Sequence, residues 1–197
     1  MKRVSLSAVT VVDEAATLAD EAGLDAVTLS AVARRLGVQT PSLYSHVRDH
    51  AALLDGITAL ALDDLGRRIA VEIAGRSRRD ALAGLAAAHR ALALEAPGRW
   101  QALQRRAGPA AVRSDAARDL VALNDAVLRG YGLPDAERVH AIRLIGSTIN
   151  GFLALEAAGN FDHSDPAPIE SWTRAIDALD ATLSAWSAGS RTESSSE

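Results

Sequence analysis

Apolar residues recur every three or four positions along most of this chain, which is the spacing of one face of an α-helix. No stretch of the sequence indicates a β-strand, so the pattern predicts an all-α protein of about nine helices. In the first helix, the predicted buried stripe is Val9, Val12, Ala16 and Ala19. The predicted helices cover 5–22, 29–36, 41–47, 50–74, 78–96, 114–130, 134–158 and 169–187, with a short helix or ordered loop within 98–112.

Two short predicted helices between residues 28 and 47 are separated by a tight turn. Thr28 is a suitable N-cap for the first helix, and Gly37 is the residue type that most easily adopts the left-handed conformation at a helix end. Thr40 then offers a capping hydroxyl, and Pro41 suits the first position of the second helix. Two short helices joined by such a glycine-containing turn indicate a helix-turn-helix.

The second of these helices has two distinct faces. At ~100° per residue, Leu43 and Val47 fall together and are the predicted buried side. The outward side is hydroxyl-rich at its start and aromatic and basic further along, as in helices that read base edges and touch phosphates. It carries Pro41, Ser42, Ser45 and Arg48, with Tyr44 on the flank. Any short amphipathic helix needs a polar side, but the paired caps and the crowding of Ser, Tyr, His and Arg favour DNA binding.

The segment LGVQTPSLYSHVRDHAALLDGI, residues 36–57, resembles the DNA-binding domain of the tetracycline-repressor (TetR) family of transcription regulators. The match is close at Gly37-Val38, Leu43-Tyr44, His46-Val47 and Leu53-Leu54. The resemblance implies that the first three helices bind DNA, and that the remaining helices dimerise and hold a small ligand.

The same resemblance implies roles for individual residues. Gln39, Thr40, Pro41 and Ser42 match positions that read bases in the major groove. A glutamine amide can pair with adenine, and a prolyl ring or threonine methyl can touch a thymine methyl. Thr28, Tyr44, His46 and Arg48 match positions that contact phosphate, although Thr28 and Thr40 can also serve only as caps and Tyr44 as a partly buried anchor. His50 stands where the family often has lysine, so we expect a weaker phosphate contact there.

Composition limits the other classes of function. The net charge of the 197 residues is −4, but residues 28–48 hold three arginines (Arg34, Arg35 and Arg48) and no acid, so a basic surface would be local. The chain has no cysteine, which excludes a disulfide framework, a thiol nucleophile and a thiolate metal site. No apolar run approaches the ~18 residues of a membrane span, so we expect a cytoplasmic protein with no membrane partner.

The last two long helices each carry a narrow apolar seam. Two such helices can pack on each other within one chain, or meet their copies in a four-helix bundle. We expect a homodimer, because one helix-turn-helix rarely reads enough DNA and because the TetR family dimerises through its last two helices. The predicted dimer contacts are Ile142, Ile145, Ile149 and Phe152, followed by Ile169, Trp172, Ile176, Leu179, Leu183 and Trp186.

A few polar or aromatic side chains on otherwise apolar faces are candidates for a ligand site. Each alone is more often a satisfied core group, but together they indicate a mostly apolar cavity with a few orienting groups. The candidates are His89, Trp100, Leu103, Asn124, Ser147 and Asn150. The stretches AHRALALEAPGRW (88–100) and INGFLALEAAGNF (149–161) also resemble the ligand domain named for its Trp-His-Gly (WHG) pattern, with Asn150 where that pattern has histidine.

Nothing in the sequence favours catalysis. The histidines are scattered, no metal-ligand spacing such as HExxH occurs, and no glycine-rich phosphate loop follows a strand. We therefore predict no catalytic residues, metal or cofactor. The predicted function is a regulator, most simply a repressor, that binds a palindromic operator as a dimer and is released by a small apolar effector. Its predicted domains are 1–48 for DNA, 49–188 for ligand and dimerisation, and a disordered tail at 189–197. The alternative is a helical binding protein or enzyme in which the helix-turn-helix is only architectural.

Overall fold

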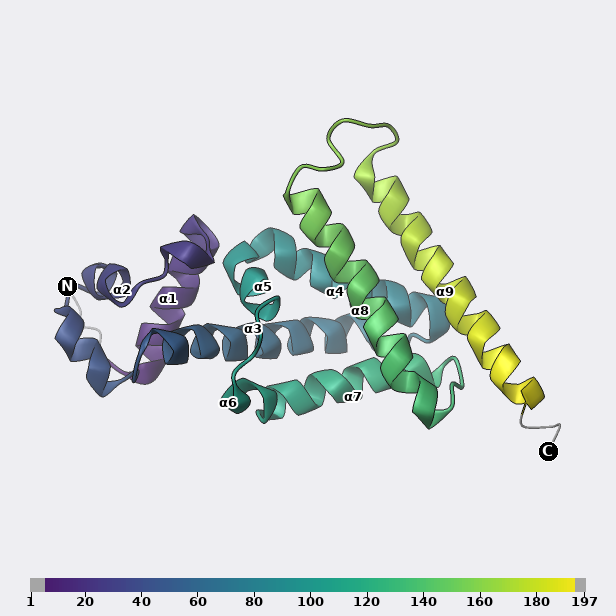
Figure 1. Ribbon diagram of the computed structural model, residues 1–197, viewed down its shortest axis with the longest axis horizontal. Coiled ribbons are helices and arrows are strands. Elements are labelled where there is room, and N and C mark those ends of the chain that lie inside the picture. The colour runs from purple at the N-terminus through teal and green to yellow at the C-terminus, as the bar shows by residue number, and fades with distance from the viewer. Residues whose placement is uncertain (1–5, 194–197) are drawn as a thin grey trace. The chain divides into compact units, whose positions relative to one another are not determined.

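The computed structural model describes the backbone of residues 6–193, in which helices are the only regular secondary structure, as the apolar pattern predicts (Figure 1). It contains nine α-helices and two short 3-10 helices (η). Their bounds are α1 Ala8–Ala22, η1 Leu24–Ala26, α2 Leu29–Leu36, η2 Thr40–Ser45, α3 His50–Ile73, α4 Arg78–Glu95, α5 Pro97–Leu103, α6 Pro109–Val112, α7 Asp115–Arg129, α8 Asp135–Ala157 and α9 Pro168–Glu193. None of the described helices has the length and apolar character needed to cross a membrane.

The chain folds into two compact units. The first holds the described residues up to Gly66 together with Ala91–Asp119, and the second holds Arg67–Arg90 and the described residues from Leu120 onward. The long helices α3, α4 and α7 therefore each contribute residues to both units. The functional boundary predicted between residues 48 and 49 divides the chain differently, and it stays a prediction.

The first unit is built on the core between α1, α2, η2 and the start of α3. α1 begins with a capping box. The Ser7 hydroxyl accepts a hydrogen bond from the Thr10 amide, and the Thr10 hydroxyl accepts one from the Ser7 amide, so two amide groups at the helix start are satisfied. Its buried face contains Val11, Ala15 and Leu18, whereas Val9 is 68% exposed. Of the predicted stripe, Ala16 and Ala19 are buried and Val12 is half-buried against the same core, so only the placement of Val9 was wrong.

The two predicted helices of the helix-turn-helix both form, with one difference of type. Thr28 caps α2 by accepting a hydrogen bond from the amide of Ala31 at 3.1 Å, and Gly37 ends it in the left-handed conformation with φ 68°. η2 is a 3-10 helix, and its N-cap position is Gln39 rather than Thr40, with no side-chain cap. The predicted cap at Thr40 was wrong, because the helix already begins at that residue. A segment of six residues is short enough for the tighter 3-10 hydrogen bonds.

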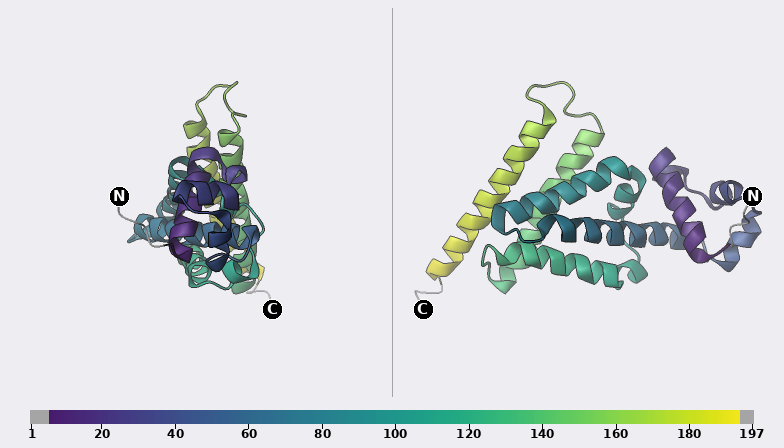
Figure 2. Two further views of the ribbon diagram at one scale, coloured as in Figure 1. Left: turned by 90° about the vertical axis from the view of Figure 1, so that its left-hand side faces the viewer. Right: turned by 180° about the vertical axis from the view of Figure 1, so that it is seen from behind.

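In the second unit, α8 and α9 lie side by side and run in opposite directions (Figures 1 and 2). Their apolar seams are buried within the single chain, at Ile145, Ile149 and Leu153 of α8 and Trp172, Ile176, Leu179 and Leu183 of α9. α9 continues to Glu193, past its predicted end at Ser187, so the first residues of the predicted tail are helical. Residues 194–197 of that tail, and Ser5 at the predicted start of the first helix, lie outside the described residues.

Candidate nucleic-acid interface and ligand-site residues

The short helix η2 is fixed to the first unit by its buried side chains. Leu43 is fully buried and Val47 is 6% exposed, and both belong to the same core as Val32 and Leu53. With these residues turned inward, the opposite side of η2 faces solvent. Gln39, Pro41, Ser42, Tyr44 and Ser45 are exposed, and Thr40 and His46 are half-buried. The structure therefore gathers the predicted base-reading residues on one accessible face.

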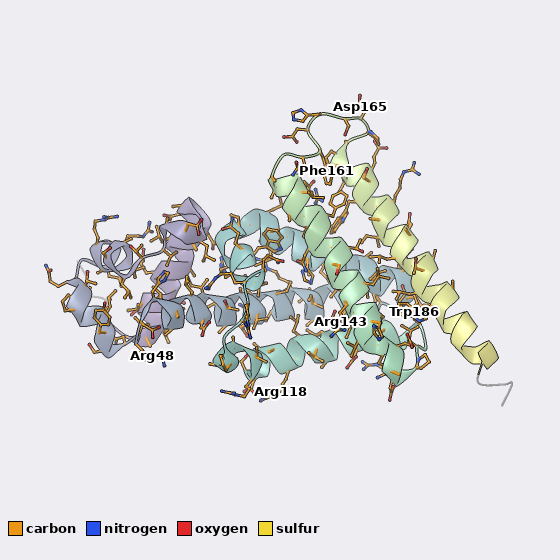
Figure 3. All side chains as sticks on the ribbon, viewed as in Figure 1. Arg48, Arg118, Arg143, Phe161, Asp165 and Trp186 are labelled. Atoms are coloured by element: carbon orange, nitrogen blue, oxygen red, sulfur yellow. The ribbon has the colours of Figure 1, made fainter. Side chains whose placement is uncertain are left out.

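The turn after η2 is fixed by Asp49. Its carboxylate accepts a hydrogen bond from the amide of Ala52 at 2.8 Å, which caps α3. This bond, together with the guanidinium of Arg48, lowers the pKa of Asp49 below its usual value. Arg48 lies 2.8 Å from the same carboxylate through its Nε, and its side chain remains 83% exposed (Figure 3). Arg48 is accessible, but part of its charge is offset by its neighbour.

The basic surface is smaller than a count of arginines indicates. Arg35 forms ion pairs with Glu14 and Glu21 of α1, and these bonds raise its pKa further above its usual value. Arg34 is exposed and makes no ion pair with any described residue. Acids that lie outside residues 28–48 therefore offset part of the charge of the three arginines within that range.

His50 packs its ring against the chain just before α2. Its Nε2 lies 2.7 Å from the carbonyl oxygen of Val27, so Nε2 must donate a proton to that oxygen. The other ring nitrogen, Nδ1, can donate to a phosphate only when the ring is doubly protonated. The geometry thus gives His50 a structural contact, one that ties the start of α3 to the residue preceding the cap Thr28.

Sequence reasoning missed the role of α5, which packs against α1 and η1 within the first unit. Arg99 donates to Asp20 of α1 through both its backbone amide (2.9 Å) and Nε (2.8 Å), and to Asp64 of α3 through Nη1 (3.0 Å). The preceding Gly98 lies against the backbone of Ala19, where a side chain would collide. The glycine was the only available signal, because ion pairs between residues 79 and 35 positions apart leave no local pattern.

The predicted ligand residues fall in both units, Trp100 and Leu103 in the first and the other four in the second. Asn124 and Asn150 donate to the carbonyls of Leu120 and Gly146 in their own helices, and Ser147 donates to Arg143. These three polar side chains therefore have hydrogen-bond partners within their own helices.

Two of the ligand candidates have unsatisfied buried atoms. His89 Nδ1 and Trp100 Nε1 are buried and have no hydrogen-bond partner among the described residues. Burial lowers the pKa of His89 to about 4, so the ring is neutral at pH 7. Unpaired buried polar atoms are unusual in native proteins and often mark a place for a water or ligand.

The predicted dimer contacts are mostly occupied within the chain. Six of them are buried, Ile142, Phe152 and Trp186 are half-buried, and Ile169 is 52% exposed. The six buried residues are Ile145, Ile149, Trp172, Ile176, Leu179 and Leu183. The assignment of these six to a dimer surface was wrong, because the apolar seams pack inside the second unit.

Two of the predicted dimer contacts, Phe152 and Trp172, belong to an aromatic cluster within the chain. The ring of Phe152 lies 4.9 Å from that of Phe161, in the loop after α8, and 5.1 Å from that of Trp172 (Figure 3). Arg90 of α4 lies over the Trp172 ring at 5.4 Å and pairs with Glu156 at 2.6 Å. This cluster joins α4, α8 and α9 of one chain.

The exposed sides of the last two helices carry a different pattern. On α8, Arg143, Ser147, Gly151 and Ala154 are exposed at spacings of four, four and three. On α9, Arg174, Ala178, Ala181 and Ala185 are exposed at spacings of four, three and four. Each helix thus presents an exposed face of mainly small residues. Among the described residues, no three or more His, Asp or Glu side chains gather in a way that would hold a metal ion.

Two separate stretches of the chain match known protein families. Residues 11–57 match the bacterial regulatory proteins of the tetR family, and residues 82–179 match the tetracyclin repressor-like C-terminal domain. An uncharacterized HTH-type transcriptional regulator of Mycobacterium tuberculosis is 35% identical over 162 residues, which is 81% of this chain and 74% of the relative. The class D tetracycline repressor protein of Escherichia coli is 44% identical over 57 residues, 29% of this chain and 25% of that repressor.

Solved structures show the same fold. The TetR family protein ActR of Streptomyces coelicolor, in complex with actinorhodin, aligns with a TM-score of 0.76 and 16% identity. The alignment covers 93% of this chain and 99% of ActR.

Proposed function

Since this chain belongs to the tetR family of bacterial regulatory proteins, we propose that it is a ligand-responsive transcriptional repressor that binds a palindromic operator as a homodimer. The observation that carries the proposal is the exposed polar face of η2, held outward by the buried Leu43 and Val47. A recognition element needs such a face, because sequence is read by side chains that reach base edges. The two copies of η2 would enter successive major grooves roughly 34–36 Å apart or slightly more.

Within each head, the proposed roles divide by position. Gln39, Thr40, Pro41 and Ser42 read bases, and Thr28, Tyr44, His46 and Arg48 contact phosphate. Thr28 both caps α2 and contacts phosphate, since a capped helix N-terminus also attracts anions. His50 contributes mainly by positioning, because its Nε2 is already bonded to Val27.

The proposed dimer surface is the exposed small-residue faces of α8 and α9, in place of the buried seams. Small side chains allow two helices to approach closely, and a Cβ added at Gly151 would meet no atom within 4 Å. Arg143 and Arg174 begin the two faces and would lie at the edge of the contact. Sedimentation of the wild type and of a Gly151→Arg variant tests this surface.

The proposed effector is small and largely apolar, and contacts residues among His89, Trp100, Leu103, Asn124, Ser147 and Asn150. Neutral His89 supports an uncharged or weakly polar partner, because a ring with a pKa of about 4 adds no positive charge at pH 7. The related ActR was solved with actinorhodin. The same proposal divides the chain into residues 1–48 for DNA and 49–188 for ligand and dimerisation. It also includes the partial likeness to the WHG type, a cytoplasmic location and the lack of an enzymatic activity.

The proposed route from ligand to DNA passes through α5. Arg99 binds both α1 and α3, and Gln101 accepts from the amide of Leu24 at 3.2 Å. A shift of α5 would therefore be carried to α1 and alter the placement of the recognition element. Such coupling is reciprocal, so operator DNA should weaken effector binding.

A DNA-binding titration with the region upstream of its own gene tests the proposal. We expect saturable binding that competitor DNA of unrelated sequence does not remove, and that weakens as salt rises. A protein whose helix-turn-helix is only architectural would bind neither this DNA nor any selected site. A thermal-shift screen over apolar metabolites tests the effector, because a ligand that binds the native state raises the melting temperature.

A further inference from the structure

A groove opens between α1 and α3 within the first unit, and none of the residues assigned above to DNA, effector or dimer lines it. Its volume is about 340 Å³, and it is lined by residues of α1 between Ala8 and Asp13 and of α3 between Gly56 and Asp63. This volume lies at the lower end of the roughly 300–1,000 Å³ typical of small-molecule sites.

The groove has a geometric cause. α1 crosses the first half of α3 (Figures 1 and 2), and a Cβ added at Gly56 would lie 2.8 Å from Cγ2 of Val12, so the helices are in close contact there. The remaining lining residues are Ala8, Val9 and Asp13 of α1 and Ala59, Leu60 and Asp63 of α3. The groove is the space between these residues beside the contact of Val12 with Gly56.

The lining combines an apolar floor with acidic edges. Val9 is 68% exposed, and Val12 and Leu60 are half-buried. The charged lining residues are Asp13 from α1 and Asp63 from α3, and none of the described Lys or Arg residues lines the groove. The carboxylate of Asp13 is exposed and makes no ion pair with any described residue.

We propose that this groove binds small amphipathic cations, meaning an ammonium group on a short aromatic or alkyl body. The apolar body would cover Val9, Val12 and Leu60, which removes apolar surface from water. The ammonium would face the exposed carboxylate of Asp13, whereas an anion of the same shape would be repelled. The volume is too small for a helix of a second protein, which is about 10 Å across.

This site is separate from the proposed effector residues, so its test does not depend on the proposed function. The test follows the methyl NMR signals of Val9, Val12 and Leu60 in the full chain, titrated with 2-phenylethylamine, 2-phenylethanol and phenylacetate. The three probes share an aromatic body and differ in charge. We expect saturable shifts with the amine, weaker binding of the alcohol and none of phenylacetate.

Two variants locate the charge. Asp13→Asn should weaken amine binding about two- to fivefold, the usual strength of an exposed ion pair, and leave alcohol binding unchanged. Asp25→Asn, which removes an exposed acid of η1 outside the groove, is the matched control and should bind the amine as the wild type does. Ala59→Phe, which fills the groove, should abolish binding of both probes.

Equal binding of the amine and the alcohol would overturn the proposal, as would equal losses in the Asp13→Asn and Asp25→Asn variants.

Discussion

Arg48 and Arg35 carry the same charge in the same DNA-binding head, yet the structure predicts different consequences when each is replaced by alanine. Arg48 is 83% exposed and paired only with the adjacent Asp49. Arg35 is held by Glu14 and Glu21, and its side chain is 31% exposed. A phosphate can therefore recruit Arg48 by displacing one exposed carboxylate, whereas Arg35 would have to leave two.

The magnitude follows from counterion release. Each phosphate neutralised by a side chain contributes about 0.9 to the slope of log affinity against log salt concentration. Arg48→Ala removes one such contact per head and should reduce the slope by about 1.8 for a dimer on a full operator. Arg35→Ala should leave the slope unchanged and lower the stability of the head. Asp49→Asn keeps a capping side chain for α3 and releases Arg48, so it should tighten binding.

Fluorescence anisotropy with a labelled operator, repeated from low to moderate salt, measures all three variants. The far-UV circular dichroism spectrum checks that each variant is folded. An Arg35→Ala slope that falls as far as that of Arg48→Ala would refute the reasoning, because it would mean that the ion pairs with α1 do not withhold Arg35 from DNA. An unchanged slope for Arg48→Ala would refute the assignment of Arg48 to phosphate.

Four further outcomes are expected. Thr28→Ala should lower the free energy of unfolding by about 1 kcal/mol in a urea titration, and Thr40→Ala by much less, because only Thr28 caps a helix. His89 has a folded-state pKa of about 4, below its unfolded value, so the unfolded state binds more protons. The free energy of unfolding should therefore fall by on the order of 3 kcal/mol as the pH drops from 6.5 to 4. The His89→Phe variant should lack that part of the pH dependence. Arg99→Ala should destabilise the protein by on the order of 1–3 kcal/mol and weaken the response of DNA binding to effector, measured by calorimetry and anisotropy. Ala178→Arg should shift sedimentation toward the monomer if the exposed face of α9 forms the dimer, and an unchanged dimer would exclude that face.

The local features of the DNA-binding head could be predicted from the sequence because their causes are local. A threonine before an apolar run and a glycine after it predicted the caps at Thr28 and Gly37, and both form. The same reasoning placed Leu43 and Val47 on the buried side of the recognition element.

Features that depend on distant partners could not be predicted in this way. Periodicity identified the seams of α8 and α9 but not the surface they pack against, which is the interior of the same chain. The pairing of Arg35 with Glu14 and Glu21, and the attachment of α5 through Arg99, join segments far apart in sequence. Val9 was misplaced on α1 because alanines surround the helix and leave its apolar stripe poorly defined.

The central claim is that the exposed face of η2 reads DNA in two symmetric copies, and selection of binding sites from random DNA tests it most directly. For the wild type we predict an inverted repeat with half-sites about one helical turn apart or slightly more. For Gln39→Ala we predict a loss of preference at the same position of both half-sites. Enrichment of a single unrepeated site, or an identical preference in the wild type and the Gln39→Ala variant, would contradict the account.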